Sequence, residues 1–201
     1  MMDSGALLES MREKRALLEG HFELSSGLHS DRYFQCALFL QYPKEAGEAA
    51  EGLARVLREV KPDLVVGPAM GAVTFSYEVG RVLGTRAIFT ERKDGEMCLR
   101  RGFEVETGTR VVVVEDVLTT GGSAREVIRV IQGLGGVVVA AACLVNRSGG
   151  NPFADLDIPL VALADVQARS WRAEECPLCQ SSDEPAVKPG SRPGISAASG
   201  S

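Results

Sequence analysis

Long apolar segments are missing from this sequence of 201 residues. No stretch approaches the roughly 18 consecutive apolar residues that a membrane-spanning helix needs. The first twenty residues carry charges at helical spacing, without the uninterrupted apolar region of a secretory signal peptide. We therefore expect a cytoplasmic protein with no membrane partner.

An excess of positive charge and a disulfide-like cysteine pattern are also missing. The formal net charge is −5, so bulk electrostatics argue against a nucleic-acid partner, and any cation for a small ligand must be local. The five cysteines are odd in number and mostly far apart, which fits a reducing compartment. The length suggests one main domain over residues 1–182. The Pro-, Ser-, Gly- and Ala-rich tail, residues 183–201, is expected to be disordered.

Strands and helices alternate along most of the chain. An amphipathic helix is predicted over residues 3–19, a turn-rich hairpin within residues 20–34, and a helix from Pro43 to Val60. Short apolar runs then predict buried strands separated by helices, at residues 64–66, 86–90, 110–114 and 137–145, with an edge strand at 159–163. This order predicts an α/β fold with a central, mostly parallel sheet flanked by helices.

Two acids and a run of small polar residues follow the strongest predicted strand. Beyond residues 111–114 the chain continues with Glu115, Asp116, Val117, Leu118, Thr119, Thr120, Gly121, Gly122 and Ser123. Ligands of open α/β sheets bind beyond the carboxyl ends of the strands, and a small-residue loop that opens a helix favours a phosphate. The acids would repel a phosphate but suit sugar hydroxyls or a divalent metal, so the segment indicates a phosphorylated sugar.

Two better-known phosphate motifs are absent, since neither a Gly-Lys-Ser/Thr loop nor G-x-G-x-x-G occurs. The alternative is an ordinary strand–turn–helix junction with two solvated acids. Within the predicted helix, Ser123 and Glu126 have the spacing of a capping box.

The segment 111–123 resembles the phosphoribosyl pyrophosphate (PRPP) signature of the type I phosphoribosyltransferases. The resemblance implies their fold, with a small hood built from residues 1–40 and the C-terminal part. It also implies that Glu115 and Asp116 hold the ribose hydroxyls and that the Thr/Gly loop holds the 5-phosphate. The implied cofactor is Mg²⁺, bound mainly through PRPP, and no direct protein ligand is assigned to it.

Residues 22–34 are similar to the N-terminal segment of orotate phosphoribosyltransferases. The resemblance implies that Tyr33 and Phe34 wall the orotate pocket and that Thr119 faces both substrates. It further implies that Arg147, just past the strand at 137–145, meets the orotate carboxylate, which a guanidinium matches in two parallel hydrogen bonds. The alternatives are core packing for the aromatic pair and a plain surface position for Arg147.

Residues 91–108 are similar to the mobile catalytic loop of this family. Arg92 and Lys93 match its basic pair, and with Asp116 they are the expected catalytic residues. The resemblance implies a homodimer in which Lys93 serves the neighbouring site. The usual proton donor of the loop has no counterpart here, because the stretch reads Asp94-Gly95-Glu96-Met97. A solvated charged hairpin is the alternative.

Residues 67–71 resemble the loop that binds pyrophosphate in the family, without the lysine that many members carry there. Ser25 likewise stands where some members have a lysine that contacts PRPP. The implied reaction transfers the 5-phosphoribosyl group from PRPP to orotate, giving orotidine 5′-monophosphate and pyrophosphate for pyrimidine synthesis. A purine phosphoribosyltransferase and a non-catalytic PRPP-sensing regulator are the alternatives. Tyr33, Phe34 and Arg147 argue against the first, and the acidic composition argues against the second.

The C-terminal part contains Cys176-Pro-Leu-Cys179, a single CxxC. Alone it is half of a zinc site, which a second subunit could complete, and an ordinary thiol-containing turn is the preferred interpretation. The two histidines, His21 and His29, have no metal-ligand spacing to any partner along the sequence.

Overall fold

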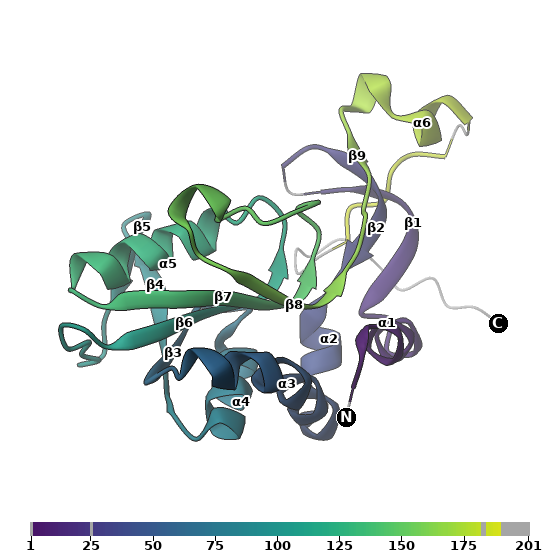
Figure 1. Ribbon diagram of the computed structural model, residues 1–201. Coiled ribbons are helices and arrows are strands. Elements are labelled where there is room, and N and C mark those ends of the chain that lie inside the picture. The colour runs from purple at the N-terminus through teal and green to yellow at the C-terminus, as the bar shows by residue number, and fades with distance from the viewer. Residues whose placement is uncertain (1, 25, 182–183, 190–201) are drawn as a thin grey trace.

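The centre of the protein is a six-stranded sheet with helices on both faces (Figure 1). The computed structural model describes residues 2–24, 26–181 and 184–189. The strand order is β5-β4-β3-β6-β7-β8, parallel throughout except for β5, which runs antiparallel to β4. These strands are β3 (Leu64–Pro68), β4 (Arg86–Lys93), β5 (Glu96–Leu99), β6 (Arg110–Leu118), β7 (Val137–Asn146) and β8 (Leu160–Asp165). The expected α/β fold with a mostly parallel sheet is confirmed, and β8 lies at the predicted edge.

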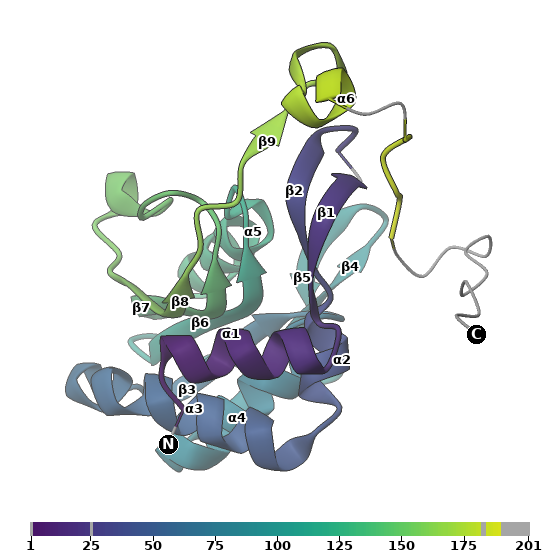
Figure 2. The ribbon, with the colours of Figure 1, turned by 90° about the vertical axis from the view of Figure 1, so that its right-hand side faces the viewer.

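Helices from both halves of the chain cover the two faces of this sheet (Figure 2). One face packs against α1 (Ser4–Glu13), α2 (Cys36–Leu40), α3 (Pro43–Leu57) and α4 (Val73–Leu83), and the other against α5 (Gly122–Gly133). The short 3₁₀ turns are η1 (Arg58–Val60), η2 (Ala154–Leu156) and η3 (Ala173–Glu175). No helix in the described part of the chain is long and apolar enough to cross a membrane.

The valine run of β6 shows why the strand is fixed at the centre. Val112 and Val114 belong to the core on the α3–α4 side, whereas Val111 and Val113 belong to the core under α5, and all four are fully buried. Successive side chains of a strand point to opposite faces, so an uninterrupted apolar run requires a sheet covered on both sides. The polar residues that follow the run are thereby placed at the edge of the core.

A second, three-stranded sheet forms the hood over one end of the main sheet. It pairs β1 (Leu17–Glu23), β2 (His29–Phe34) and β9 (Ser170–Trp171), and α6 (Pro177–Ser181) lies at its tip. The hood thus joins residues 17–34 to the C-terminal part. Of the segment 1–40 that was expected to contribute to it, α1 and α2 pack against the main sheet instead. Val187 also hydrogen-bonds His21 and Glu23 of β1 through its backbone. Residues 184–189, expected in a disordered tail, therefore lie beside β1, and residues 183 and 190–201 lie outside the described residues.

Two local expectations differ from the structure. The first helix was expected to reach residue 19 but ends at Glu13, because Arg15 takes a left-handed φ of 56° and Leu17 begins β1. Ser123 does not cap α5: the cap position is Gly121, whose φ of 75° favours glycine. The chain turns into α5 through the backbone of Gly121, which leaves the Ser123 hydroxyl free of a capping role.

Candidate functional site

The acid- and glycine-rich segment lies at the carboxyl end of β6, between β3 and β7. The backbone at Gly121 packs closely against the loop that follows β7, since a Cβ at Gly121 would lie 3.1 Å from the side chains of Pro152 and Phe153. The N–H of Val117 donates to Asp116 Oδ1 at 2.9 Å, which fixes that carboxylate at the end of the strand. The arrangement presents backbone N–H groups and hydroxyls around one concave end of the sheet.

The two acids of this segment are held partly out of water. Glu115 is only 9% exposed. Burial, and then the adjacent Asp116 carboxylate, raise the pKa of Glu115 to about 8. Burial also raises the pKa of Asp116, although the N–H of Val117 opposes that change. A pair in this state gains most from hydroxyl donors or a cation, which favour the charged forms.

The glycine loop after β3 closes directly on these acids. A Cβ on Gly71 would lie 3.0 Å from Asp116 Oδ2, and one on Gly67 would lie 2.7 Å from Ser76 Oγ. Glycine at position 71 lets the backbone pass close beside Asp116, whereas glycine at position 67 lets β3 pack closely against Ser76 of α4. Residues 67–71 are the loop that the resemblance assigned to pyrophosphate, and Met70 in it is 85% exposed.

Two cavities meet at the Thr/Gly loop. The first, the loop cavity, has a volume of about 260 Å³. Its lining consists of Arg92, Glu115, Val117, Leu118, Thr119, Thr120, Gly121, Gly122, Ser123 and Glu126. The second, the hood cavity, has a volume of about 540 Å³. Its lining consists of Leu24, Ser26, Leu28, Tyr33, Val117, Thr119, Thr120, Arg147, Ser148, Ala168 and Ser170. The two cavities share Val117, Thr119 and Thr120.

The aromatic pair of β2 divides between two environments. Tyr33 lines the hood cavity, and its ring lies 6.0 Å from that of Phe22. Phe34 is 7% exposed and packs in the core, where its ring lies 5.3 Å from the Arg147 guanidinium carbon. Only Tyr33 is therefore placed to contact a ligand in the cavity, and Phe34 supports Arg147 from below.

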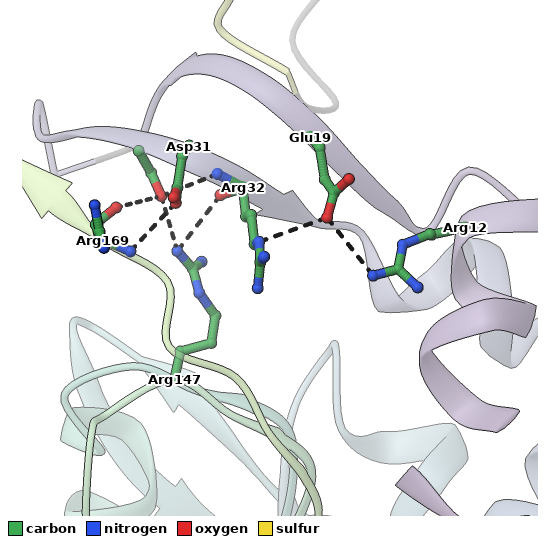
Figure 3. A network of polar contacts seen from close by, with 7 residues as sticks. Arg12, Glu19, Asp31, Arg32, Arg147 and Arg169 are labelled. Carbon is green, nitrogen blue, oxygen red and sulfur yellow. Dashed lines mark hydrogen bonds and ion pairs between the residues drawn. The ribbon is translucent and has the colours of Figure 1, made fainter. Parts of the chain in front are cut away.

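Arg147 rises from the end of β7 toward the hood (Figure 3). Its Nη2 donates to Ser30 Oγ at 3.2 Å and to the carbonyl oxygen of Arg32 at 3.4 Å, both neutral acceptors. Its Nε is buried and has no partner among the residues that the structure describes. Burial lowers the pKa of this guanidinium. A half-buried cation with neutral acceptors and a spare, buried donor atom fits an anionic ligand.

The two basic residues of the catalytic-loop segment, Arg92 and Lys93, lie in different environments. Residues 91–99 form the hairpin of β4 and β5, which turns at Asp94 and Gly95, both with positive φ. Arg92 lines the loop cavity, where it forms two hydrogen-bonded contacts with Glu126 of α5, at 2.8 and 2.9 Å. Lys93 is exposed at the end of β4, and it is not among the described residues that line either cavity.

Comparison with known proteins assigns the chain to a family. Residues 39–158 match the model described as the phosphoribosyl transferase domain. The orotate phosphoribosyltransferases of Caldicellulosiruptor bescii and Heliobacterium modesticaldum are 51% and 52% identical to this chain. Each alignment covers 95% of this chain, and they cover 99% and 100% of the two relatives. The chain belongs to the orotate phosphoribosyltransferase family.

Solved structures of similar fold agree with this family. The orotate phosphoribosyltransferase of Aeropyrum pernix aligns with a TM-score of 0.67 at 26% identity, over 80% of this chain and 94% of that one. Leishmania donovani UMP synthase aligns with a TM-score of 0.71 at 24% identity, over 90% of this chain and 39% of that one. The second likeness concerns the fold alone.

Some residues of this orotate phosphoribosyltransferase site were not singled out from the sequence. Ser30 is fully buried and accepts a hydrogen bond from Arg147. In the sequence nothing distinguishes it from the other serines of a turn-rich segment. Glu126 reads as a helix-capping acid, and its pairing with Arg92 spans 34 residues. The alternation of β2 could have indicated that Ser30 faces inward with the buried Phe34, four residues on. Ser25 lies outside the described residues.

Proposed function

We propose that this chain joins orotate to the ribose of PRPP, giving orotidine 5′-monophosphate and pyrophosphate. One observation carries the proposal: the loop cavity and the hood cavity meet at Thr119 and Thr120. One cavity has the Thr/Gly loop and Glu115 of the acid pair. The other has the aromatic ring of Tyr33 and the half-buried Arg147. The ribose C1 would lie at the junction, where its bond to a pyrophosphate oxygen breaks and its bond to the orotate nitrogen forms.

Each part of PRPP has a matching part of the loop cavity. The 5-phosphate fits the loop 119–123 and the N-terminus of α5, whose N–H groups favour an anion. The ribose hydroxyls fit Glu115 and Asp116, and ionised carboxylates also stabilise positive charge that develops on the ribose ring. Pyrophosphate leaves toward the backbone of residues 67–71, with Arg92 on the side of α5. Catalysis of this kind rests on positioning and on charge stabilisation.

Mg²⁺ is the cofactor we infer for the same cavity. The two carboxylates offer the hard oxygen atoms that this ion prefers, and their raised pKa values mean that a nearby cation would stabilise them. When bound, the ion would neutralise phosphate oxygens of PRPP. Glu115 and Asp116 would orient the ribose, and the residues that line the loop cavity would exclude water from it.

Arg147 is the residue we propose for selecting orotate over uracil. The two pyrimidines differ by one carboxylate, so discrimination needs a cation in the base pocket. Arg147 projects into the hood cavity with its Nε unpartnered within the described chain. Tyr33 offers a ring for stacking in the same cavity. The adenine phosphoribosyltransferases that share this fold at 22% and 20% identity are similar in fold alone.

Turnover with three bases tests the function directly. Purified protein should consume PRPP with orotate, and turn over uracil and hypoxanthine at least about a hundred-fold less efficiently. Release of pyrophosphate and formation of the nucleotide would be followed together. Turnover with hypoxanthine instead of orotate would identify a purine phosphoribosyltransferase. No turnover with any of the three bases would favour a non-catalytic protein that senses PRPP.

The role of Arg147 has its own test. Loss of a charge-assisted pair costs roughly 1.5–3 kcal/mol, or about ten- to over a hundred-fold in affinity. Arg147→Ala should raise the orotate KM by that factor, whereas PRPP binding should change little. Arg147→Lys is the matched control, because it keeps the charge without the planar pair of donors. Its orotate KM should lie between those of the parent chain and of Arg147→Ala. Unchanged orotate binding in Arg147→Ala would contradict the assignment.

We also infer a cytoplasmic homodimer, without nucleic-acid or membrane partners, in which Lys93 reaches the neighbouring site. Lys93 is exposed at the end of β4 and does not line the loop cavity or the hood cavity of its own chain, which supports this arrangement. Chains with Lys93→Ala and chains with Asp116→Asn would be mixed under subunit exchange. Recovery of activity is expected, since one hybrid site keeps both intact residues. No recovery despite demonstrated exchange would place Lys93 within its own chain.

A further inference from the structure

Four metal-binding side chains meet at the tip of the hood, away from both cavities. His21 comes from β1, His29 from the start of β2, and Cys176 and Cys179 from the segment that carries α6. Their four ligand atoms all lie within 4.8 Å of one another. The missing half of the CxxC pattern is thus supplied by two histidines of the same chain, more than a hundred residues away in sequence, and a second subunit is not needed.

Four of the six separations between these atoms lie within about 0.4 Å of the edges of one tetrahedral coordination sphere. His21 Nε2 lies 3.6 Å from Cys176 Sγ and 3.5 Å from Cys179 Sγ, and His29 Nδ1 lies 3.2 Å from Cys179 Sγ. Zinc–sulfur and zinc–nitrogen bonds of usual length set a nitrogen–sulfur edge of about 3.6 Å and a nitrogen–nitrogen edge of about 3.3 Å. The two histidine nitrogens are 2.9 Å apart, so they would separate by only roughly 0.4 Å around an ion.

The chemistry of the donors selects the metal. Two thiolates and two imidazoles in a tetrahedron suit zinc, whereas Mg²⁺ takes oxygen ligands in an octahedron. This cluster is therefore separate from any magnesium that accompanies PRPP. Cys176 is fully buried, and both histidines are partly buried. Four ligands from protein leave no open position, which is typical of a structural site rather than a catalytic one.

We propose that His21, His29, Cys176 and Cys179 bind one zinc ion per chain and that this ion clamps the hood together. Binding converts each thiol to a thiolate and releases its proton to solvent. The clamp lies beside the shortest strand of the hood, because β9 contributes only two residues, which pair with His29 and Ser30. Ser30 is also the residue that accepts from Arg147. The zinc ion would thus fix the wall that positions the arginine of the hood cavity.

Metal binding can be measured without any assay of activity. Protein stripped with a chelator under reductant should take up one zinc ion per chain in competition with a chromogenic chelator. Cobalt loaded in its place should give the intense visible bands of a tetrahedral ion together with thiolate charge-transfer absorption. Cys179→Ser should weaken zinc binding by at least about a hundred-fold. Cys98→Ser, which removes a partly buried thiol of β5 outside the cluster, should bind like the parent chain.

Several outcomes would overturn the proposal. Zinc uptake by the parent chain no greater than by Cys179→Ser would do so, and so would a cobalt spectrum without thiolate bands. Finding Cys176 and Cys179 joined as a disulfide in protein kept under reductant, with no zinc bound, would assign the pair to redox chemistry instead. His29→Asn serves as a second variant if Cys179→Ser does not fold. Zinc should also raise the unfolding temperature of the parent chain and leave that of His29→Asn unchanged.

Discussion

The buried carboxyl of Glu115 should make the stability of the ligand-free protein depend on pH. Burial and the neighbouring Asp116 raise its pKa from an ordinary 4.5 to about 8. Between these two values the folded chain holds a proton that the unfolded chain has released. Stability must therefore fall as the pH rises through this window, and level off above the folded pKa. Glu115→Gln removes the titration while keeping the size and shape of the side chain.

The size of the effect follows from the two pKa values. One pKa unit corresponds to about 1.36 kcal/mol, so one such group gives a slope of up to about 1.4 kcal/mol per pH unit inside the window. From about pH 5.5 to about pH 7.5 the parent chain should lose about 2.5 kcal/mol of stability relative to Glu115→Gln.

Urea unfolding at a series of pH values measures this difference. The free energies of the parent chain and of Glu115→Gln should converge near pH 5 and diverge toward pH 8, with the variant more stable at the higher pH. Glu51→Gln, which replaces an exposed side chain of α3, is the control. Its free energy of unfolding plotted against pH should run parallel to that of the parent chain. If the curve of Glu115→Gln also runs parallel to the parent, then Glu115 is solvated and the reasoning fails.

Two further substitutions test the surroundings of the acid pair. Gly71→Ala places a methyl group 3.0 Å from Asp116 Oδ2. The kcat/KM for PRPP should therefore fall by at least about tenfold, with little change in the unfolding midpoint. Initial rates measured at varied PRPP concentration would contradict this if they were the same as those of the parent chain. Glu126→Gln frees Arg92 from a solvent-exposed pair whose side chains are 46% and 33% exposed, so the unfolding midpoint should change little. PRPP should bind more tightly at low salt in this variant, and weaker binding, measured by calorimetry, would refute the role of Arg92.

The central strand and its loop could be predicted because the information is local. The run Val111–Val114, the acid pair and the glycines follow one another in the chain, and the sheet only has to bury the first part. The same holds for Arg147, which directly follows a strand. The family resemblance added the names of the ligands, whereas strand periodicity alone predicted the position of the site.

Features that depend on distant segments were beyond the sequence. His21 and Cys176 are 155 residues apart, and no spacing rule connects them. Phe34 looked equivalent to Tyr33, yet neighbouring residues of a strand face opposite ways, and only Tyr33 faces the cavity. The first helix was predicted too long because Leu17 and Leu18 continue its apolar pattern, and the left-handed turn at Arg15 is decided by the hood that Leu17 enters.

The pairing of β2 with β9 has a consequence for the order in which this protein is made. His29 finds its partner Trp171 only when the C-terminal part has left the ribosome. At about 5–20 residues per second, β2 waits roughly 7–28 s for a strand about 140 residues downstream. During that time β2 has an open edge. The strands β3, β4 and β6 can pair during synthesis, but β8 and the base pocket are completed only after nearly the whole chain has emerged.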